Sequence, residues 1–268
     1  MKQIPFIKMD GLGNDFVIID CRKNKISLTQ ALIQKMSNRK TGIGLDQLIV
    51  LKKSKICDVK MEIYNADGTI AGACGNGTRC VSSLIFEETK KKQITLEAPY
   101  KKVLTAWRGK QITVDMGEAK IDWRDIPLSK KADTLNLKVL AALPKAVCVS
   151  MGNPHAVFFV NNVGKIDIAK LGAQVEKHKL FPQKTNVEFA QILGPQKIRM
   201  RVWERGAGIT LACGSGACAT LVGAIRRGLV KSKASIIMDG GTLFIEQKQN
   251  RILMSGPVNK AFCGIYFA

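Results

Sequence analysis

The sequence predicts an α/β protein of the α+β type, built from two similar halves. A stretch at residues 64–80, YNADGTIAGACGNGTRC, recurs in altered form at 203–219 as WERGAGITLACGSGACA. The cysteines of the two copies, Cys74 and Cys213, lie 139 residues apart in the chain. Two further pairs keep this separation, Asn14 with Asn153 and Gln47 with Asn186. Because similarity at a fixed offset is the sign of a duplicated unit, we predict two pseudo-symmetric domains.

Both halves show the same order of expected elements. Period-two alternation and β-branched residues predict strands at 5–9, 16–20, 47–51, 59–65, 94–98, 103–107, 111–116, 147–151, 156–160, 187–192, 198–203, 235–238, 243–247, 251–254 and 261–267. Helical spacing of apolar residues predicts helices after a capping box that begins at Ser27, after Cys74, near 167–176 and after Cys213.

The domain boundary is expected in the segment 117–144, which has no clear periodicity. We assign residues 1–117 and 260–268 to an N-terminal half that carries Cys74, and 118–259 to a C-terminal half that carries Cys213.

Composition excludes several classes of protein. The chain has 268 residues, of which 46% are hydrophobic, which suits a globular protein of one or two domains. No apolar run approaches the roughly 20 residues of a membrane span, and the first residues lack the apolar core of a secretory signal. Cytoplasmic localisation without membrane association is therefore expected.

Cysteine and charge give two further expectations. Eight cysteines are too few for a disulfide scaffold in a chain of this length, and with two histidines and no Cys-x-x-Cys spacing a metal site is not expected. The net charge is +21, but the lysines are scattered and no nucleic-acid motif accompanies them. We expect no nucleic-acid partner; a positive field would favour the arrival of an anionic small molecule.

The two repeated cysteines have the setting of reactive thiols. Each stands just before a predicted helix, where free peptide N–H groups and the positive end of the helix dipole lower a thiol pKa. The glycines that follow let backbone amides approach a bound carboxylate closely. One sulfur could then remove an α-proton while the other supplies a proton to the opposite face. The alternatives are that both cysteines fill space, or that one is a nucleophile with His155 as its base.

Polar residues accompany both motifs at turns or strand ends. Singly, each is more often a turn or cap residue than a ligand. Together they could line a polar pocket, in which Arg205 would hold a second carboxylate with its planar fork. The set is Asn14, Gln47, Asn65, Asn153, Asn186, Glu204 and Arg205. Asp67-Gly68 is interpreted as a turn, Arg79 as a structural ion-pair residue, and His155 as a strand residue or a modulator of a nearby thiol.

The chain resembles the diaminopimelate epimerase family in six stretches that span nearly its whole length. These are KMDGLGNDF (8–16), NRKTGIGLDQ (38–47), NADGTIAGACGNGTR (65–79), GNPHAV (152–157), TNVEF (185–189) and WERGAGITLACGSGA (203–217). Departures are small: Thr69 stands where the family commonly has serine, and Leu45 where alanine is frequent.

The resemblance implies two similar domains, each a curved mixed sheet around a central helix, with the site in the cleft between them. It implies interconversion of LL- and meso-2,6-diaminopimelate for lysine and peptidoglycan synthesis, without pyridoxal phosphate, metal or other cofactor. Cys74 matches the proton acceptor and Cys213 the donor in the LL to meso direction.

The resemblance also assigns the polar residues. The seven side chains named above match substrate-binding positions, while Gly75-Asn76 and Gly214-Ser215 match the amides that hold the reacting carboxylate. His155 and Glu204 match residues that tune the thiols. The family is commonly dimeric, and Phe262 stands where an aromatic dimer contact is expected. The rival hypotheses are a related two-cysteine racemase of the proline racemase type and a noncatalytic anion-binding protein of the same fold.

Overall fold

The computed structural model describes residues 3–24, 26–72, 74–99 and 102–268, and it divides into two compact units. Unit 1 consists of residues 1–114 and 256–268, and unit 2 of residues 115–255. The chain therefore passes from unit 1 to unit 2 and returns for its last strand. Ala73, within the first cysteine motif, lies outside the described residues.

Unit 1 contains a mixed sheet whose strands follow the order β16-β1-β2-β3-β4-β5-β6-β7. Its strands are β1 (Gln3–Gly11), β2 (Asn14–Asp20), β3 (Gln47–Lys52), β4 (Val59–Asn65), β5 (Gln93–Ala98), β6 (Lys102–Arg108) and β16 (Asn259–Phe267), together with β7 (Ile112–Glu118), which begins in unit 1 and continues past its boundary at Val114. The β2–β3 and β4–β5 pairs are parallel, and the other pairs are antiparallel. The last strand of the chain thus pairs with the first.

Unit 2 contains the same pattern of pairs. Its strands are β8 (Val147–Ser150), β9 (Pro154–Phe159), β10 (Asn186–Gly194), β11 (Lys197–Glu204), β12 (Gly208–Thr210), β13 (Lys233–Met238), β14 (Gly241–Lys248) and β15 (Arg251–Gly256). The β9–β10 and β11–β13 pairs are parallel, and the others are antiparallel. The identical succession of parallel and antiparallel pairs from β1 to β7 and from β8 to β15 confirms the predicted duplication.

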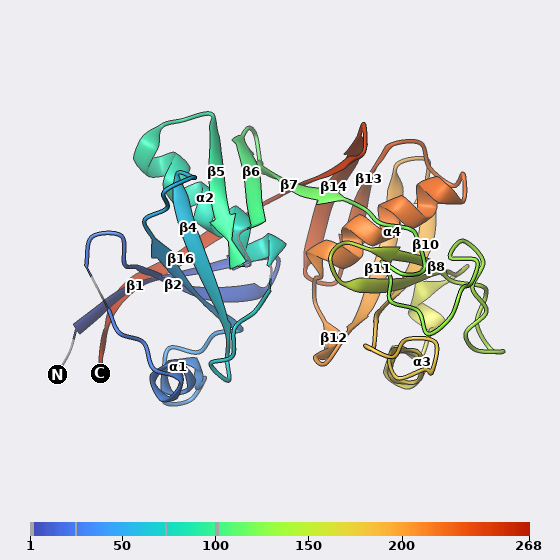
Figure 1. The fold of residues 1–268 in the computed structure, drawn as a ribbon, viewed down its shortest axis with the longest axis horizontal. Coiled ribbons are helices and arrows are strands. Elements are labelled where there is room, and N and C mark those ends of the chain that lie inside the picture. The colour runs from blue at the N-terminus through green and yellow to red at the C-terminus, as the bar shows by residue number, and fades with distance from the viewer. Residues whose placement is uncertain (1–2, 25, 73, 100–101) are drawn as a thin grey trace. The chain divides into compact units, whose positions relative to one another are not determined.

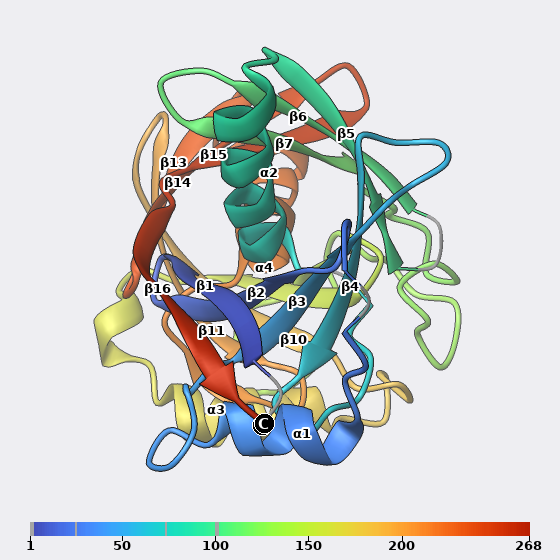
Figure 2. The ribbon, with the colours of Figure 1, turned by 90° about the vertical axis from the view of Figure 1, so that its left-hand side faces the viewer.

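A central helix packs against the sheet of each unit. In unit 1, α2 (Gly75–Thr89) contacts β1, β2, β5 and β6, and Figure 2 shows these strands around the helix. In unit 2, α4 (Gly214–Arg226) contacts β8, β9, β10, β11, β13 and β14 (Figure 1). Both helices begin directly after a motif cysteine, which serves as the N-cap residue in each case.

The strands beneath these helices are buried on both faces. In unit 1, Val17, Ile19, Leu48 and Val50 pack with the apolar side of α1 (Gln30–Ser37). Side chains alternate along a strand, so the intervening residues point to the opposite face, toward α2. In unit 2, Phe158 and Phe189 stack with ring centroids 5.6 Å apart on the side of α3 (Ile168–Glu176). The sheet in each unit is therefore a layer between two helices.

Two details differ from the sequence predictions. The first helix is capped by Thr29, whose hydroxyl accepts the Leu32 N–H, and not by Ser27. Gln30 consequently stands at the first helical position, and its amide donates to the carbonyl of Asp67 instead of closing a capping box. Strand β12 was not predicted, because its three residues are too short to show a period. A short 3₁₀ helix, η2 (Val163–Lys165), precedes α3.

Candidate functional site

The predicted site residues fall into two groups, one in each unit. We call the first the unit 1 half-site, which consists of Asn14, Gln47, Asn65, Cys74, Gly75 and Asn76. The unit 2 half-site consists of Asn153, His155, Asn186, Glu204, Arg205, Cys213, Gly214 and Ser215. Phe262 lies on β16, where it is half exposed and contacts Phe6 edge to face at a centroid distance of 5.9 Å.

Cys74 is held at the first turn of α2 by its own sulfur. The Gly77 N–H donates to Cys74 Sγ at 3.3 Å, so the thiol caps one of the amides that the start of a helix leaves unsatisfied. Gly75 and Asn76 complete the turn, and Asn76 is buried, with its Oδ1 accepting from Arg79 Nη2 at 3.0 Å. A carboxylate at this turn would meet backbone N–H groups and the positive end of the dipole.

Asn14 is oriented toward the sulfur by a charged network. Its Nδ2 donates to Asp46 Oδ2 at 2.8 Å, which leaves Oδ1 facing Cys74 Sγ at 3.7 Å. Asp46 is in turn paired with Arg39 at 2.7 Å, and Arg39 also binds Asp15. Sequence reasoning missed this network, although its members lie within the KMDGLGNDF (8–16) and NRKTGIGLDQ (38–47) stretches.

Gln47 and Asn65 lie opposite each other on β3 and β4. Gln47 Nε2 donates to Asn65 Oδ1 at 3.3 Å, while Asn65 Nδ2 donates to Thr69 Oγ1 at 3.1 Å. The Gln47 Oε1 atom is buried and has no hydrogen-bond partner among the described residues. An acceptor in this state can take a hydrogen bond from a ligand such as an ammonium group.

Cys213 occupies the same position at the first turn of α4. The Gly216 N–H donates to Cys213 Sγ at 3.4 Å, and Ser215 Oγ lies 3.5 Å from the sulfur. Unlike Cys74, which is half-buried, Cys213 is buried, with an exposed fraction of 5%. The two thiols therefore have the same backbone setting and different surroundings.

A chain of hydrogen bonds leads away from Cys213 into unit 2. Ser215 Oγ accepts from Asn153 Nδ2 at 3.4 Å, and Asn153 Oδ1 lies 3.0 Å from His155 Nε2. His155 Nδ1 lies 2.7 Å from Glu188 Oε1, and both of these side chains are fully buried. The sequence interpretation named His155 but missed Glu188, although Glu188 is the one charged residue in the strand pattern at 187–192.

Three more predicted residues surround the turn after β11. Asn186 Oδ1 accepts the backbone N–H of Arg205 at 3.0 Å, and Arg205 Nη1 donates to the Gln183 carbonyl at 3.2 Å. Glu204 accepts a short hydrogen bond from Thr210 and a hydrogen bond from the Cys213 thiol. Arg205 is exposed, so its guanidinium is available to a charged ligand.

The sequence analysis expected the start of the helix to lower both thiol pKa values, and for Cys213 this expectation is wrong because burial outweighs the helix start. Burial raises the pKa of the Cys213 thiol well above its ordinary value, and the Glu204 and Glu188 carboxylates raise it further. The hydrogen bonds from Ser215 and Gly216 act in the opposite direction and are weaker. Burial also raises the pKa of Glu204. At neutral pH Cys213 is therefore a thiol, able to donate a proton.

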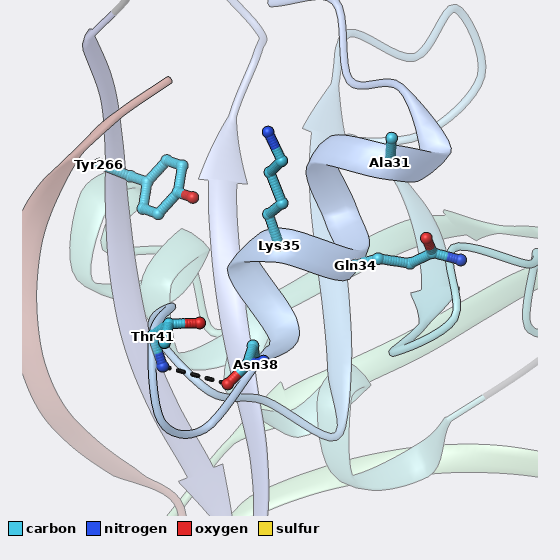
Figure 3. A pocket seen from close by; sticks show the side chains of 6 residues that line it. All are labelled: Ala31, Gln34, Lys35, Asn38, Thr41 and Tyr266. Atoms are coloured by element: carbon cyan, nitrogen blue, oxygen red, sulfur yellow. Dashed lines mark hydrogen bonds between the residues drawn. The ribbon is translucent and has the colours of Figure 1, made fainter.

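The described structure also contains a pocket outside both half-sites. A pocket of about 540 Å³ lies beside α1 and β16 (Figure 3), and its lining contains none of the predicted residues. It is lined by Ala31, Gln34, Lys35, Asn38, Thr41 and Tyr266. Within the described ranges, no three His, Cys, Asp or Glu side chains gather as a metal site. No helix there has both the length and the apolar character needed to cross a membrane.

Solved structures with the same two-unit fold include racemases and related enzymes. A phenazine biosynthesis protein of the PhzF family from Bacillus anthracis matches with a TM-score of 0.71 at 13% identity, covering all of both chains. A probable proline racemase from Agrobacterium radiobacter, solved with bound carbonate, matches with a TM-score of 0.70 at 14% identity over 97% of this chain and 92% of that chain. The chain thus shares its fold with these two proteins.

The sequence comparisons then give the family. The family model of diaminopimelate epimerase matches residues 6–121 and 147–261. The diaminopimelate epimerase of Rhodospirillum centenum is 50% identical over 264 residues, which cover 97% of this chain and 91% of the relative. That of Acidiphilium cryptum is 45% identical over 263 residues, covering 97% and 95%. This chain belongs to the diaminopimelate epimerase family.

Proposed function

We propose that this protein interconverts LL- and meso-2,6-diaminopimelate by proton transfer at the α-carbon, with Cys74 and Cys213 as the two acid–base groups. In the LL to meso direction, Cys74 removes the α-proton and Cys213 delivers a proton to the opposite face. The observation that carries the proposal is the pair of thiols, each the N-cap of a central helix at equivalent positions of a duplicated unit. Membership of the family supports the substrate.

The half-sites supply what the reaction requires. Each helix start offers backbone N–H groups to the carboxylate beside the reacting carbon: Gly75 and Asn76 in unit 1, Gly214 and Ser215 in unit 2. Charge that develops on that carboxylate as the α-proton leaves is stabilised by these fixed dipoles. No group of the substrate needs to be bound covalently, since removal and return of a proton suffice for inversion.

The different surroundings of the two thiols support the assignment of Cys74 as proton acceptor and Cys213 as proton donor. Burial and two carboxylates keep Cys213 protonated, as a donor must be before turnover begins. When Cys213 gives up its proton to the substrate, Cys74 has gained one, so the pair is ready for the reverse reaction. The direction of catalysis is then set by which stereoisomer binds.

The distal end of the substrate distinguishes this proposal from a proline racemase. Diaminopimelate carries a second ammonium and carboxylate, whereas proline carries neither. We assign the distal carboxylate to Arg205, whose exposed guanidinium is held at the β11 turn, and the amide and carboxylate oxygens of Asn65, Asn186 and Glu204 to the ammonium groups. Gln47, with its unpartnered Oε1, and Asn14 and Asn153 complete the polar lining.

We further propose that the enzyme works in the cytoplasm, as a homodimer, and supplies a precursor of lysine and peptidoglycan. Supporting the dimer, Phe262, Ile265 and Phe267 are exposed apolar residues of β16, which stands at the end of the unit 1 strand order. Sedimentation equilibrium would give the mass of the particle; a monomer at micromolar concentration would refute this part.

Single-cysteine variants test the mechanism. Cys74→Ala and Cys213→Ala are incubated separately with LL- and meso-diaminopimelate in deuterated water, and α-proton loss is followed by NMR. We expect each variant to lose epimerisation, and any residual exchange to occur in one stereoisomer without inversion, because the remaining thiol reaches one face only.

Cys21→Ala serves as the matched control, since Cys21 lies just after β2 and outside both half-sites. It should keep full activity. Undiminished epimerisation by either Cys74→Ala or Cys213→Ala would overturn the two-thiol assignment. Exchange of proline but not of diaminopimelate by the unmodified enzyme would favour the rival racemase.

A further inference from the structure

The two half-sites differ in what lies beneath the thiol. Phe16 and His155 occupy equivalent positions, and so do Ile49 and Glu188, since each pair is 139 residues apart like the two cysteines. The strand registers agree, because Phe16 pairs with Gln47 as His155 pairs with Asn186. An apolar pair in unit 1 is thus replaced by an imidazole and a carboxylate in unit 2.

The first helical turn lies directly on these side chains in each unit. A Cβ on Gly77 would lie 2.7 Å from Ile49 Cδ1 and 3.3 Å from Phe16 Cε1, with Cys74 Sγ at 3.5 Å. A Cβ on Gly216 would lie 2.8 Å from Glu188 Oε1 and 3.3 Å from Cys213 Cβ. The carboxylate therefore stands under the turn that carries Cys213, in the place where unit 1 has a methyl group.

Glu188 is an unfavourable residue for a purely structural role. It is fully buried, and its Oε2 has no hydrogen-bond partner among the described residues, which costs folding free energy. Unit 1 shows that the same strand position, under the same helix turn, accepts isoleucine. A buried carboxylate retained at such a cost indicates a function for its charge or its hydrogen bond.

We propose that Glu188 is a positioning residue of the epimerase, which fixes His155 and through it the Asn153–Ser215 pair against Cys213. The hydrogen bonds run from Glu188 Oε1 to His155 Nδ1, from His155 Nε2 to Asn153 Oδ1, and from Asn153 Nδ2 to Ser215 Oγ, which lies beside the sulfur. The contact with His155 Nε2 fixes the Asn153 side-chain amide with its oxygen toward the imidazole. Its Nδ2 is thereby directed to Ser215 Oγ, so each hydrogen bond orients the next residue of the chain. This inference rests on the proposed function.

The proposal also makes the two thiols chemically unequal. Glu188 adds a negative charge to the surroundings of Cys213, while Ile49 adds none to those of Cys74. The charged and polar groups near Cys213 are Glu204 of β11, Glu188 of β10, His155 of β9 through Asn153, and Ser215 and the Gly216 N–H of α4. Removing Glu188 should therefore change the titration of Cys213 and leave that of Cys74 unchanged.

Two substitutions at position 188 distinguish a role of the side chain in hydrogen bonding from a role in filling space. Glu188→Gln keeps the shape and can still bond His155, whereas Glu188→Ile installs the residue of unit 1. We expect kcat to fall by about 100-fold in Glu188→Ile, because a misplaced acid–base group costs that much, with KM changed little. Glu188→Gln should recover at least part of that loss. It should also be the more stable of the two variants, because it keeps a hydrogen-bond partner for the buried His155 Nδ1, which isoleucine would leave unpaired.

The thiols are followed separately, without substrate, by the pH dependence of alkylation of each cysteine by iodoacetamide, read by peptide mass spectrometry. In both variants the midpoint of Cys213 alkylation should move to lower pH, because the Glu188 carboxylate that raises the pKa of this thiol is gone. The midpoint of Cys74 alkylation should stay where it is in the wild type. Glu176→Gln is the matched control: it removes a second buried carboxylate of unit 2, which binds Trp203 and Gly206, and should leave the Cys213 midpoint in place.

Wild-type kcat in Glu188→Ile would overturn the proposal. Equal losses in the two variants with an unmoved Cys213 midpoint would also overturn it, since that result describes a space-filling residue. If the isoleucine variant does not fold, the glutamine variant alone carries the alkylation test. Because alkylation does not involve diaminopimelate, a failure of the proposed function would appear in wild-type turnover and not in these profiles.

Discussion

Replacement of Gly216 by alanine tests how firmly the buried carboxylate of Glu188 is fixed beneath the first turn of α4. The new Cβ would lie 2.8 Å from Glu188 Oε1, so the carboxylate must move. It is anchored by the 2.7 Å contact with His155. Overpacking a core costs about 1–3 kcal/mol, a weakened charged hydrogen bond about 1.5–3 kcal/mol, and alanine in a helix returns up to about 1 kcal/mol. Together these contributions give an expected destabilisation of roughly 1.5–6 kcal/mol.

The same change in unit 1 provides the comparison. In Gly77→Ala the new Cβ would lie 2.7 Å from Ile49 Cδ1, the end of a flexible apolar side chain with no hydrogen bond to lose. Its cost, less the gain in helix propensity, should be roughly 0–1.5 kcal/mol. Urea unfolding monitored by far-UV circular dichroism measures the loss of unfolding free energy in Gly216→Ala and in Gly77→Ala. The kcat of each variant is determined in parallel. Equal destabilisation by the two alanines would refute the view that Glu188 is held in place.

Two predictions concern charged groups elsewhere in the half-sites. Arg205→Lys should lower kcat/KM for diaminopimelate by about 100-fold while the melting temperature is unchanged, because lysine keeps the charge but loses the planar fork. If the lysine variant turned over as fast as the wild type, Arg205 would contribute only a positive field. Burial alone would raise the pKa of the Asp15 carboxyl. Hydrogen bonds from Arg39 and Lys8 outweigh burial and hold this pKa well below its ordinary value. Its contribution to stability is therefore complete above the unfolded pKa of about 3.9 and is lost as pH falls toward the folded value. Asp15→Asn should flatten the loss of urea stability between about pH 5 and 3, and an unchanged slope would contradict this.

Local signals placed most secondary structure correctly, and they failed where a choice depended on distant residues. Ser27 and Thr29 are both good N-cap residues, and the sequence offers no way to choose between them. The choice is made by contacts of Gln30, whose amide donates to the carbonyl of Asp67 from another part of unit 1. Thr29 is then left at the position where its hydroxyl meets the Leu32 N–H.

The duplication and the two thiols were determined by the sequence itself. A fixed offset relates Cys74 to Cys213 and Asn14 to Asn153, and a cysteine before a glycine-rich helix start has one physical consequence, a sulfur among free N–H groups. Both N-cap assignments in the structure agree with this. Such features are readable because they depend on neighbours in the chain.

The difference between the two thiols was decided only by the tertiary structure. In the sequence Glu188 is one charged residue in a strand, and nothing local says which face it takes or what it meets. Pairing of β9 with β10 and the packing of α4 over them bring Glu188, His155 and Cys213 together. A thiol pKa depends on burial and on charges a few ångströms away, and both are properties of how segments far apart in the chain pack against one another.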